Sequence, residues 1–195
     1  MRFIVSRYNQ DIDWIKEYSD DVVLYDRSET PLPNAIVMPN IGSDWYDKLT
    51  YIIDNYDNLP DIAVYTKANL FQYISKEEFD KLYKTDKFTP LLTQNHKTYM
   101  PVCYYKDGMY YEINNYWYLY DKHPFTHNRE EMATLLGIIG KDYVPFAPGS
   151  NYIVPKGNIL KHPKDLYIKL RSYLTESRYP AEAHFIERGI YTLWS

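Results

Sequence analysis

Polar side chains follow three short apolar runs in the first third of the chain, at the point where each run ends. These polar segments are Arg7-Tyr8-Asn9, Asp26-Arg27-Ser28 and Thr66-Lys67-Ala68-Asn69. When such runs form parallel strands of one sheet, their carboxyl ends meet at one edge, and ligands of open α/β sheets bind beyond that edge. The sequence therefore predicts a polar mouth there, in which arginine, lysine and asparagine side chains meet a ligand.

Three other groups of reactive side chains indicate no catalytic or metal site. His123 and His127 have the spacing of a zinc-binding pair, but Pro124 between them disfavours a regular helix. Cys103 is the only cysteine, which excludes an internal disulfide and any multi-thiolate zinc site. Pro148-Gly149-Ser150 has no lysine in register for a phosphate-binding P-loop.

The elements that must position the polar mouth begin with a strand, a helix and a second strand. Apolar runs predict strands at Arg2 to Ser6 and Val22 to Tyr25, and helical spacing predicts a helix over Asp11 to Tyr18. A β-α-β unit of this kind implies a parallel pair with a right-handed crossover. The next expected elements are a helix from Ser43 or Asp44 to Tyr56 and a third strand at Ile62 to Tyr65.

The second half of the chain predicts antiparallel structure and further helices. Aromatic and polar residues alternate from Tyr99 to Tyr120 around the turn signal Lys106-Asp107-Gly108, which predicts a hairpin. Before it, Ser75 and Glu78 predict a capping box. The other expected elements are a helix at Arg129 to Gly137, an irregular strand at Tyr143 to Pro155, a helix at Lys164 to Leu174 and a terminal helix from Ala181 to at least Arg188.

Length and composition limit the classes of protein. The 195 residues fit one domain, and 22 Lys plus Arg against 26 Asp plus Glu leave a net charge of −4. A pI near 5.7 argues against a surface that neutralises nucleic acid. No segment approaches the roughly 18–20 apolar residues that cross a membrane, and we expect no secretory signal peptide. The single cysteine favours a cytoplasmic setting.

The order of these motifs resembles the glycosyltransferases of the GT-A type. The matching segments are Phe3 to Asn9, an acid after the second strand at Asp26, and the turn Asn40-Ile41-Gly42 before a long helix. The resemblance implies a single α/β domain, with a mixed, mostly parallel sheet flanked by helices and an added antiparallel aromatic hairpin. It implies that residues 1–70 bind a nucleotide-diphosphate sugar, with Asp26 at the nucleobase or ribose. The implied donor-binding residues are Ser6, Arg7, Tyr8, Asn9, Asp26, Arg27, Asn40, Lys67 and Asn69.

The chain is still more similar to a group of fungal and viral proteins catalogued as a domain of unknown function. The shared segments are Ser6 to Asn9, Pro39 to Gly42, Ile52 to Asp61 and Glu187-Arg188. This resemblance covers most of the chain and names no reaction. Its nearest functional neighbours are small glycosyltransferases of large algal viruses, which implies a viral capsid glycan as acceptor and the host cytoplasm as location.

The GT-A resemblance also bears on a metal. Enzymes of that type hold Mn²⁺ or Mg²⁺ against the donor diphosphate with an Asp-x-Asp pair. The corresponding residues here are Lys67-Ala68-Asn69, so the need for a metal stays open. Lys67 can instead neutralise the diphosphate as a point charge, and Asn69 can donate a hydrogen bond. The acids at Glu77, Glu78 and Asp80 belong more naturally to a capped, solvated helix face.

The same resemblance implies a general base in the terminal helix. In inverting enzymes of this type, an acid near the acceptor takes the proton of the attacking hydroxyl, which contributes about 10²–10⁴-fold. Glu182 or Glu187, with His184 between them, is the implied base, and residues 90–195 form the acceptor half, with the aromatic hairpin beside the acceptor. The alternative is a capped terminal helix whose acids form ion pairs.

These observations predict an enzyme that moves a sugar from a nucleotide-diphosphate donor to a protein or glycan acceptor. Two other functions stay open. The absence of an Asp-x-Asp pair favours a non-catalytic carbohydrate- or protein-binding module with the same fold. A hydrolase would instead need two facing carboxylates at a suitable distance.

Overall fold

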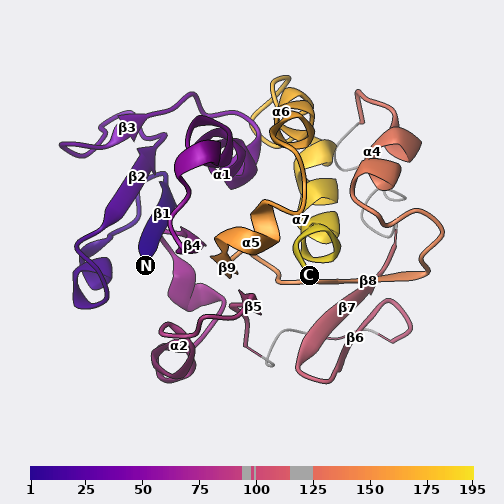
Figure 1. Ribbon diagram of the computed structural model, residues 1–195, viewed down its shortest axis with the longest axis horizontal. Coiled ribbons are helices and arrows are strands. Elements are labelled where there is room, and N and C mark those ends of the chain that lie inside the picture. Colours follow the sequence, from indigo (N-terminus) through magenta and orange to yellow (C-terminus); the bar gives the residue numbers. More distant parts are fainter. Residues whose placement is uncertain (94–97, 99, 115–124) are drawn as a thin grey trace.

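The computed structural model describes residues 1–93, 98, 100–114 and 125–195, which form an α/β fold (Figure 1). The described strands are β1 (Arg2–Arg7), β2 (Val22–Asp26), β3 (Ile36–Val37), β4 (Ile62–Lys67), β5 (Thr89–Pro90), β6 (Cys103–Lys106), β7 (Met109–Ile113), β8 (Tyr143–Phe146) and β9 (Tyr152–Pro155). The described α-helices are α1 (Ser43–Asp54), α2 (Lys76–Leu82), α4 (Arg129–Leu135), α5 (Lys156–Ile159), α6 (Lys164–Ser172) and α7 (Ala181–Trp194). Short 3-10 helices are η1 (Asp13–Glu17), η2 (Tyr56–Asn58) and η3 (Leu70–Gln72).

The larger sheet has six strands in the order β3-β2-β1-β4-β9-β5. Strand β1 pairs in parallel with β2 and β4, and β2 pairs in parallel with β3. Strand β9 runs antiparallel to both of its neighbours, β4 and β5. The sheet is therefore mixed and mostly parallel, which confirms the fold class predicted from the sequence.

Helices cover both faces of this sheet. One face carries Ile4 and Tyr65 and packs against α1, α6 and α7. The other carries Phe3, Val5 and Val64 and packs against η1, η3 and α2. Figure 1 shows α1, α6 and α7 on one side of the sheet and α2 on the other. Strands that are buried on both faces read as continuous apolar runs, which is why the sequence predicts them clearly.

The chain turns away from β1 in two directions. The connection through η1 places β2 on one side of β1, and the connection through β3 and α1 returns the chain to the other side as β4. In register, Arg7 lies beside Asp26 and Ser6 beside Lys67, so three polar strand ends meet at one edge. A crevice forms where such connections diverge, and ligands of open α/β sheets bind there.

A second, antiparallel sheet consists of β6, β7 and β8. Asp107 and Gly108 form the two-residue turn between β6 and β7, and their φ angles of 52° and 76° are those of a type I′ hairpin turn. The predicted hairpin is confirmed from Cys103 to Ile113. Tyr99 and the segment 115–120 lie outside the described residues.

Two predicted elements differ from the structure. Asp11 to Tyr18 forms the short 3-10 helix η1 rather than an α-helix, because two backbone amides turn back to the Ile15 carbonyl before the chain enters β2. Tyr143 to Pro155 is two strands in different sheets, β8 and β9, rather than one irregular strand. Gly149 and Ser150, with φ of 91° and 65°, redirect the chain between them.

The acids after β4 form hydrogen bonds that stabilise the fold around α2. Ser75 and Glu78 form the predicted capping box at the start of α2. Asp80 accepts a hydrogen bond from the Tyr18 hydroxyl at 2.6 Å. Within the described ranges, no helix combines the length and apolar character needed to cross a membrane.

Gly42, which precedes α1, supplies a first test of this packing. Its φ is 64°, and an added Cβ would lie 2.7 Å from both Cβ and the carbonyl oxygen of Leu174. Gly42→Ala is expected to cost about 1–2 kcal/mol for the left-handed backbone and about 1–3 kcal/mol more for overpacking. The free energy of unfolding in urea measures this loss.

Gly140→Ala is the matched control. Gly140 has a φ of 71° but no neighbouring heavy atom within 4 Å, so only the backbone cost is expected. Equal losses of stability in the two variants would show that the contact with Leu174 does not hold α1.

Candidate functional site

An open cavity of about 170 Å³ lies beyond the carboxyl ends of β1, β2 and β4, beside the first turn of α1. Its lining residues are Ser6, Arg7, Tyr8, Gln10, Arg27, Asn40, Ser43, Asp44, Lys67, Asn69, Tyr73, Arg178 and Tyr179. Four of these side chains are cationic and one is anionic. The cavity therefore has the position expected for a ligand site in this topology and a positive balance of charge.

Seven of the nine residues predicted to bind a nucleotide sugar line this cavity. They are Ser6, Arg7, Tyr8, Arg27, Asn40, Lys67 and Asn69. The structure brings them together because each either ends a strand or precedes α1. The other two lie outside the lining, since Asn9 is exposed on the loop after β1 and Asp26 is completely buried.

Asp26 organises the loop after β2. Its carboxylate accepts hydrogen bonds from Arg7 Nη1 at 2.5 Å, Ser28 Oγ at 2.7 Å and the Leu32 amide at 3.0 Å. Burial raises the pKa of Asp26, but these hydrogen bonds outweigh burial and lower it below its ordinary value. Asp26 thus holds Arg7 in place and does not itself reach the cavity.

Two of the four cavity cations are tightly committed to carboxylates. Arg27 donates from Nε and Nη2 to Asp47 at 2.8 and 2.7 Å, and both side chains are buried. Arg7 is held by Asp26 and also donates from Nε to the Gln10 carbonyl at 2.8 Å. Because breaking a buried ion pair leaves a charge uncompensated, these arginines shape the wall of the cavity.

The other two cations have no such tight partner. Lys67 Nζ lies 3.4 Å from Asp44 Oδ1, and 24% of the Lys67 side chain is exposed. Arg178 is exposed and, in the part of the chain that the structure describes, forms no ion pair. Its guanidinium carbon lies 4.7 Å from the ring centre of Tyr8 and 4.8 Å from that of Tyr179. Lys67 and Arg178 are therefore the cations available to an entering anion.

A buried ionic cluster of Asp44, Lys48 and Lys67 lies at the floor of the cavity. Lys48 Nζ donates to Asp44 Oδ2 at 2.5 Å and to the Ser150 carbonyl. Burial raises the pKa of Asp44, but the ammonium groups of Lys48 and Lys67 outweigh burial and hold it well below its ordinary range. Burial lowers the pKa of Lys67, but Asp44 and Glu187 raise it above its ordinary value. Asp44 and Lys67 are therefore both charged at neutral pH.

Four lining residues were not indicated by any sequence pattern: Gln10, Tyr73, Arg178 and Tyr179. The backbone amides of Gly42 and Ser43 donate to the carbonyls of Ser177 at 2.8 Å and Arg178 at 3.0 Å. These bonds hold the loop before α7 against the first turn of α1, far away in the sequence. The sequence does indicate that Lys48 is buried near Asp44, since it lies on the apolar side of the predicted helix, one turn after Asp44.

Glu182 lies outside the cavity lining and is completely buried at the start of α7. Its Oε1 accepts hydrogen bonds from the amides of Thr126 at 2.8 Å and His127 at 2.9 Å, and His127 Nδ1 lies 2.9 Å away. Glu182 thus anchors the segment before α4. His184, the third residue predicted to be catalytic, is half-buried and also outside the lining, and its carbonyl accepts from Arg188.

Glu187 is the predicted acid that lies next to the ionic cluster. Its Oε1 accepts from the Gly149 amide at 2.9 Å and from Ser150 Oγ at 3.0 Å, and its Oε2 accepts from Arg188 Nη1 at 3.2 Å. Its charge also acts on Lys67. Glu187 also lies outside the cavity lining, but of the two acids that the sequence left open as a base it is the one connected to the ionic cluster, through Ser150.

The residues at the Asp-x-Asp position do not fit a divalent cation. Ala68 is buried, Asn69 Nδ2 donates to Gln72 Oε1 at 2.6 Å, and Lys67 brings a positive charge. Asp44 is already paired with two ammonium groups, whereas Mg²⁺ and Mn²⁺ require oxygen ligands that are free to coordinate. Among residues 1–93, 98, 100–114 and 125–195, no group of three or more His, Cys, Asp or Glu could hold a metal.

A protein-family model described as "Protein of unknown function (DUF3431)" matches residues 3–194. No curated protein and no solved structure matches the chain. The matched region includes the larger sheet apart from Arg2, the first residue of β1, together with the smaller sheet and every residue that lines the cavity. The cavity thus lies within the matched family region rather than in an added segment.

Asp44→Asn tests the ionic cluster through the dependence of stability on pH. Since the pKa of Asp44 is lower in the folded than in the unfolded protein, its stabilising effect is complete above the ordinary value near 4 and fades as the pH falls below it. At neutral pH the variant is expected to lose about 3–5 kcal/mol, because Lys48 is left buried without its partner. This difference from the wild type should shrink below about pH 4. Urea unfolding at a series of pH values measures it.

Asp86→Asn is the control for this prediction. Asp86 is exposed and, within the described residues, forms no ion pair. Its free energy of unfolding is expected to follow that of the wild type at every pH. If Asp44→Asn behaves like Asp86→Asn, the cluster does not stabilise the fold.

Proposed function

The chain belongs to the DUF3431 family, and we propose from its cavity that it transfers a sugar from a nucleotide-diphosphate donor to a protein or glycan acceptor. Because the family's description names no reaction, the proposal depends on the site. The observation that carries it is the presence of two cations in one cavity at the strand ends: Arg178, and Lys67, whose ion pair with Asp44 is long at 3.4 Å. Seven of the lining residues are those nominated from the sequence for donor binding.

The cavity suits the diphosphate of such a donor. Lys67 offers a compact point charge, and Arg178 offers a planar fork that matches phosphate oxygens. The side-chain amides of Asn40 and Asn69 line the same space and can donate hydrogen bonds.

The size of the cavity restricts which part of the donor it encloses. Its volume of about 170 Å³ is below the roughly 300–1,000 Å³ of pockets that enclose drug-sized ligands. It therefore takes the phosphates, while the sugar and the nucleoside extend past its mouth. Tyr8 and Tyr179 stand beside Arg178 there, and Tyr179 is 46% exposed. Tyrosine rings of this kind offer apolar faces with a polar tip for a sugar or a base.

In the proposed reaction, the acceptor hydroxyl attacks the anomeric carbon of the donor sugar. The bond from that carbon to the phosphate oxygen breaks, and the nucleotide diphosphate leaves with the bonding electrons. Lys67 and Arg178 stabilise the negative charge that develops on the leaving diphosphate. Glu187 is the proposed base for the hydroxyl proton in a reaction that inverts the configuration, and positioning of the two substrates supplies much of the remaining rate.

The proposed setting and acceptor come from the sequence. With a single cysteine, the chain fits a reducing compartment, so we place the reaction in the cytoplasm. The resemblance to the glycosyltransferases of algal viruses favours a capsid glycan as the acceptor and a host cell as the place of synthesis. The acidic net charge of −4 is unfavourable for a nucleic acid partner.

One observation favours a second function, a non-catalytic carbohydrate- or protein-binding module. Asp44, the one carboxylate among the lining residues, is tied to Lys48 and Lys67 and keeps its charge well into acid pH. A binding module needs the cations and the tyrosines of the cavity but no free base. Binding of a donor without release of its nucleotide diphosphate in the presence of acceptors distinguishes this function from sugar transfer.

Thermal-shift measurements with a panel of nucleotide sugars test the proposal. A UDP-sugar or a GDP-sugar is expected to raise the melting temperature, since a ligand at 100 times its Kd stabilises the folded state by about 2.7 kcal/mol. CMP-sugars, which carry one phosphate, are the matched control and are expected to give a smaller shift. If no diphosphate sugar shifts the melting temperature, with or without Mn²⁺, the proposed function is wrong.

Glu187→Gln and Glu182→Gln separate the two acids that the sequence nominated. Glu187→Gln is expected to reduce turnover about 10²–10⁴-fold while the shift of melting temperature by the donor stays unchanged. Glu182→Gln is expected to lower the melting temperature and to keep the turnover of the folded protein, because Glu182 holds the segment before α4. Wild-type turnover in Glu187→Gln would remove Glu187 from the reaction.

A further inference from the structure

We infer that the cavity binds the diphosphate of its ligand without a divalent cation, and that Lys67 and Arg178 supply the positive charge instead. The nature of the complete ligand rests on the proposed function, whereas the anion site can be tested with a simpler probe. The GT-A resemblance implies the opposite, a site that needs Mn²⁺ or Mg²⁺. The geometry around Lys67 decides between them.

Lys67 stands where the resemblance implies a metal-binding aspartate. It is the last residue of β4, paired with Ser6 of β1, and its amide donates to Asn151 Oδ1 at 2.9 Å. Its ammonium group lies 3.4 Å from Asp44 Oδ1 and 5.5 Å from the ring centre of Tyr73. The Lys67 ammonium group at the end of β4 therefore places a positive charge in the cavity, where the resemblance implies a metal ion.

Lys67 can turn toward a ligand without leaving Asp44 unpaired. Oδ2 of Asp44 keeps the Lys48 ammonium at 2.5 Å, and Oδ1 keeps the Ser43 hydroxyl at 2.9 Å. Lys48 is completely buried and also bonded to the Ser150 carbonyl, so it stays in place. Because the buried carboxylate retains two donors, the movement of Lys67 to an anion leaves no uncompensated charge behind it.

A divalent cation would have to compete for the same carboxylate. Asp44 is the one acidic side chain among the lining residues, and the amino groups of Lys48 and Lys67 lie 2.5 and 3.4 Å from its two oxygens. A metal bound to Asp44 would displace at least one ammonium group or lie beside it. Displacing Lys48 leaves a buried lysine without its carboxylate, and a metal ion that takes the place of Lys67 lies beside the Lys48 ammonium group, so both arrangements are unfavourable.

The charges that remain after internal pairing match a diphosphate. The internal pairs are Arg7 with Asp26, Arg27 with Asp47, and Lys48 with Asp44. Among the lining residues and these ion-pair partners, Lys67 and Arg178 remain, which gives two positive charges. A nucleotide-diphosphate sugar carries one negative charge on each of its two phosphates at neutral pH. The two positive charges therefore neutralise the two phosphate charges without a metal ion.

Isothermal titration with inorganic pyrophosphate tests the inference on the intact chain, once in excess EDTA and once in excess Mg²⁺. The wild type is expected to bind in EDTA at least as tightly as in Mg²⁺. Lys67→Met and Arg178→Gln are each expected to weaken binding in EDTA about tenfold or more, the usual effect of losing a hydrogen bond to a charged group. Lys67→Arg, which keeps the charge, is expected to retain most of the affinity.

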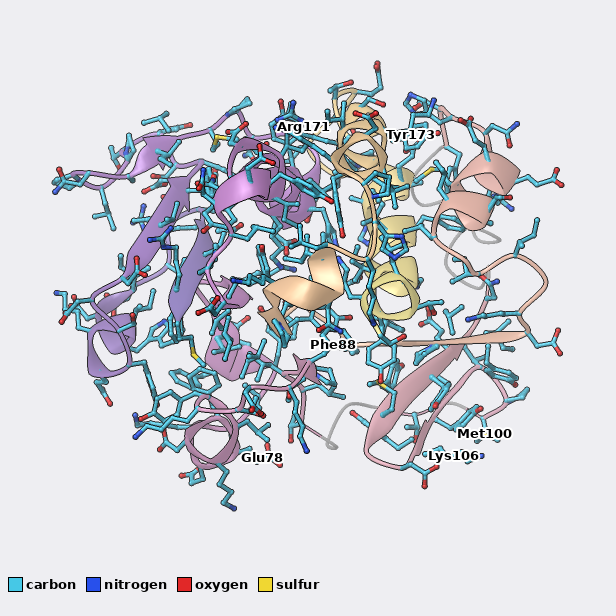
Figure 2. The ribbon with its side chains drawn as sticks, in the orientation of Figure 1. Glu78, Phe88, Met100, Lys106, Arg171 and Tyr173 are labelled. Carbon is cyan, nitrogen blue, oxygen red and sulfur yellow. The ribbon has the colours of Figure 1, made fainter. Side chains whose placement is uncertain are left out.

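Lys106→Met is the matched control. Lys106 is an exposed lysine at the turn of the hairpin, on the smaller sheet and away from α1 (Figure 2), so its loss is expected to leave pyrophosphate binding unchanged. Arg178 lies on an exposed loop, so Arg178→Gln remains informative where Lys67→Met disturbs the buried cluster. Circular dichroism confirms the fold of each variant.

The possible results separate this inference from the proposed function. Pyrophosphate binding only in Mg²⁺, no binding in either condition, or equal binding by wild type and both cavity variants overturns the metal-free site. Donor sugars that bind only with Mn²⁺ overturn it too, while the proposed transfer of sugar stands. If pyrophosphate binds in EDTA as expected but no nucleotide sugar binds, the anion site stands and the proposed function is wrong.

Discussion

The buried carboxylate of Asp44 joins three parts of the chain that together make the floor of the cavity. Lys48, one turn further along α1, reaches both Asp44 and the Ser150 carbonyl before β9, and Lys67 reaches Asp44 from the end of β4. Removing such charges from water is costly unless each finds a partner. The cluster therefore favours one arrangement of α1, β4 and β9, and that arrangement places the first turn of α1 beside the strand ends.

The same set of contacts continues through α7 to the smaller sheet. Glu187 accepts from Ser150 and Arg188, and Arg188 Nε donates to Glu112 of β7 at 2.5 Å. The Arg188 guanidinium also lies 4.7 Å from the ring centre of Phe146. Helix α7 thus stands between the ionic cluster and the aromatic hairpin.

Much of the fold was predictable from local patterns. Strands β1 and β4 are apolar runs buried on both faces, β2 is a partly buried apolar run, and α1 and α2 carry helical spacing and, in α2, a capping box. The segment from Tyr143 to Pro155 was harder, because its assignment to two sheets depends on the turn at Gly149 and Ser150 and on pairing partners far away in the sequence. The apolar spacing of Asp11 to Tyr18 predicts an α-helix where the structure has the short 3-10 helix η1, since such spacing does not limit the length of a crossover.

The candidate site, too, was predictable from the sequence only in part. The positions of Arg7, Arg27 and Lys67 at one edge follow from sequence, because the residue after a strand depends mainly on its neighbours in the chain. Which cations are available to a ligand was decided only by the tertiary structure. An ion pair depends on two side chains meeting within a few ångströms, and Asp47, Asp44 and the loop of Arg178 arrive there from other elements. No local pattern carries that information.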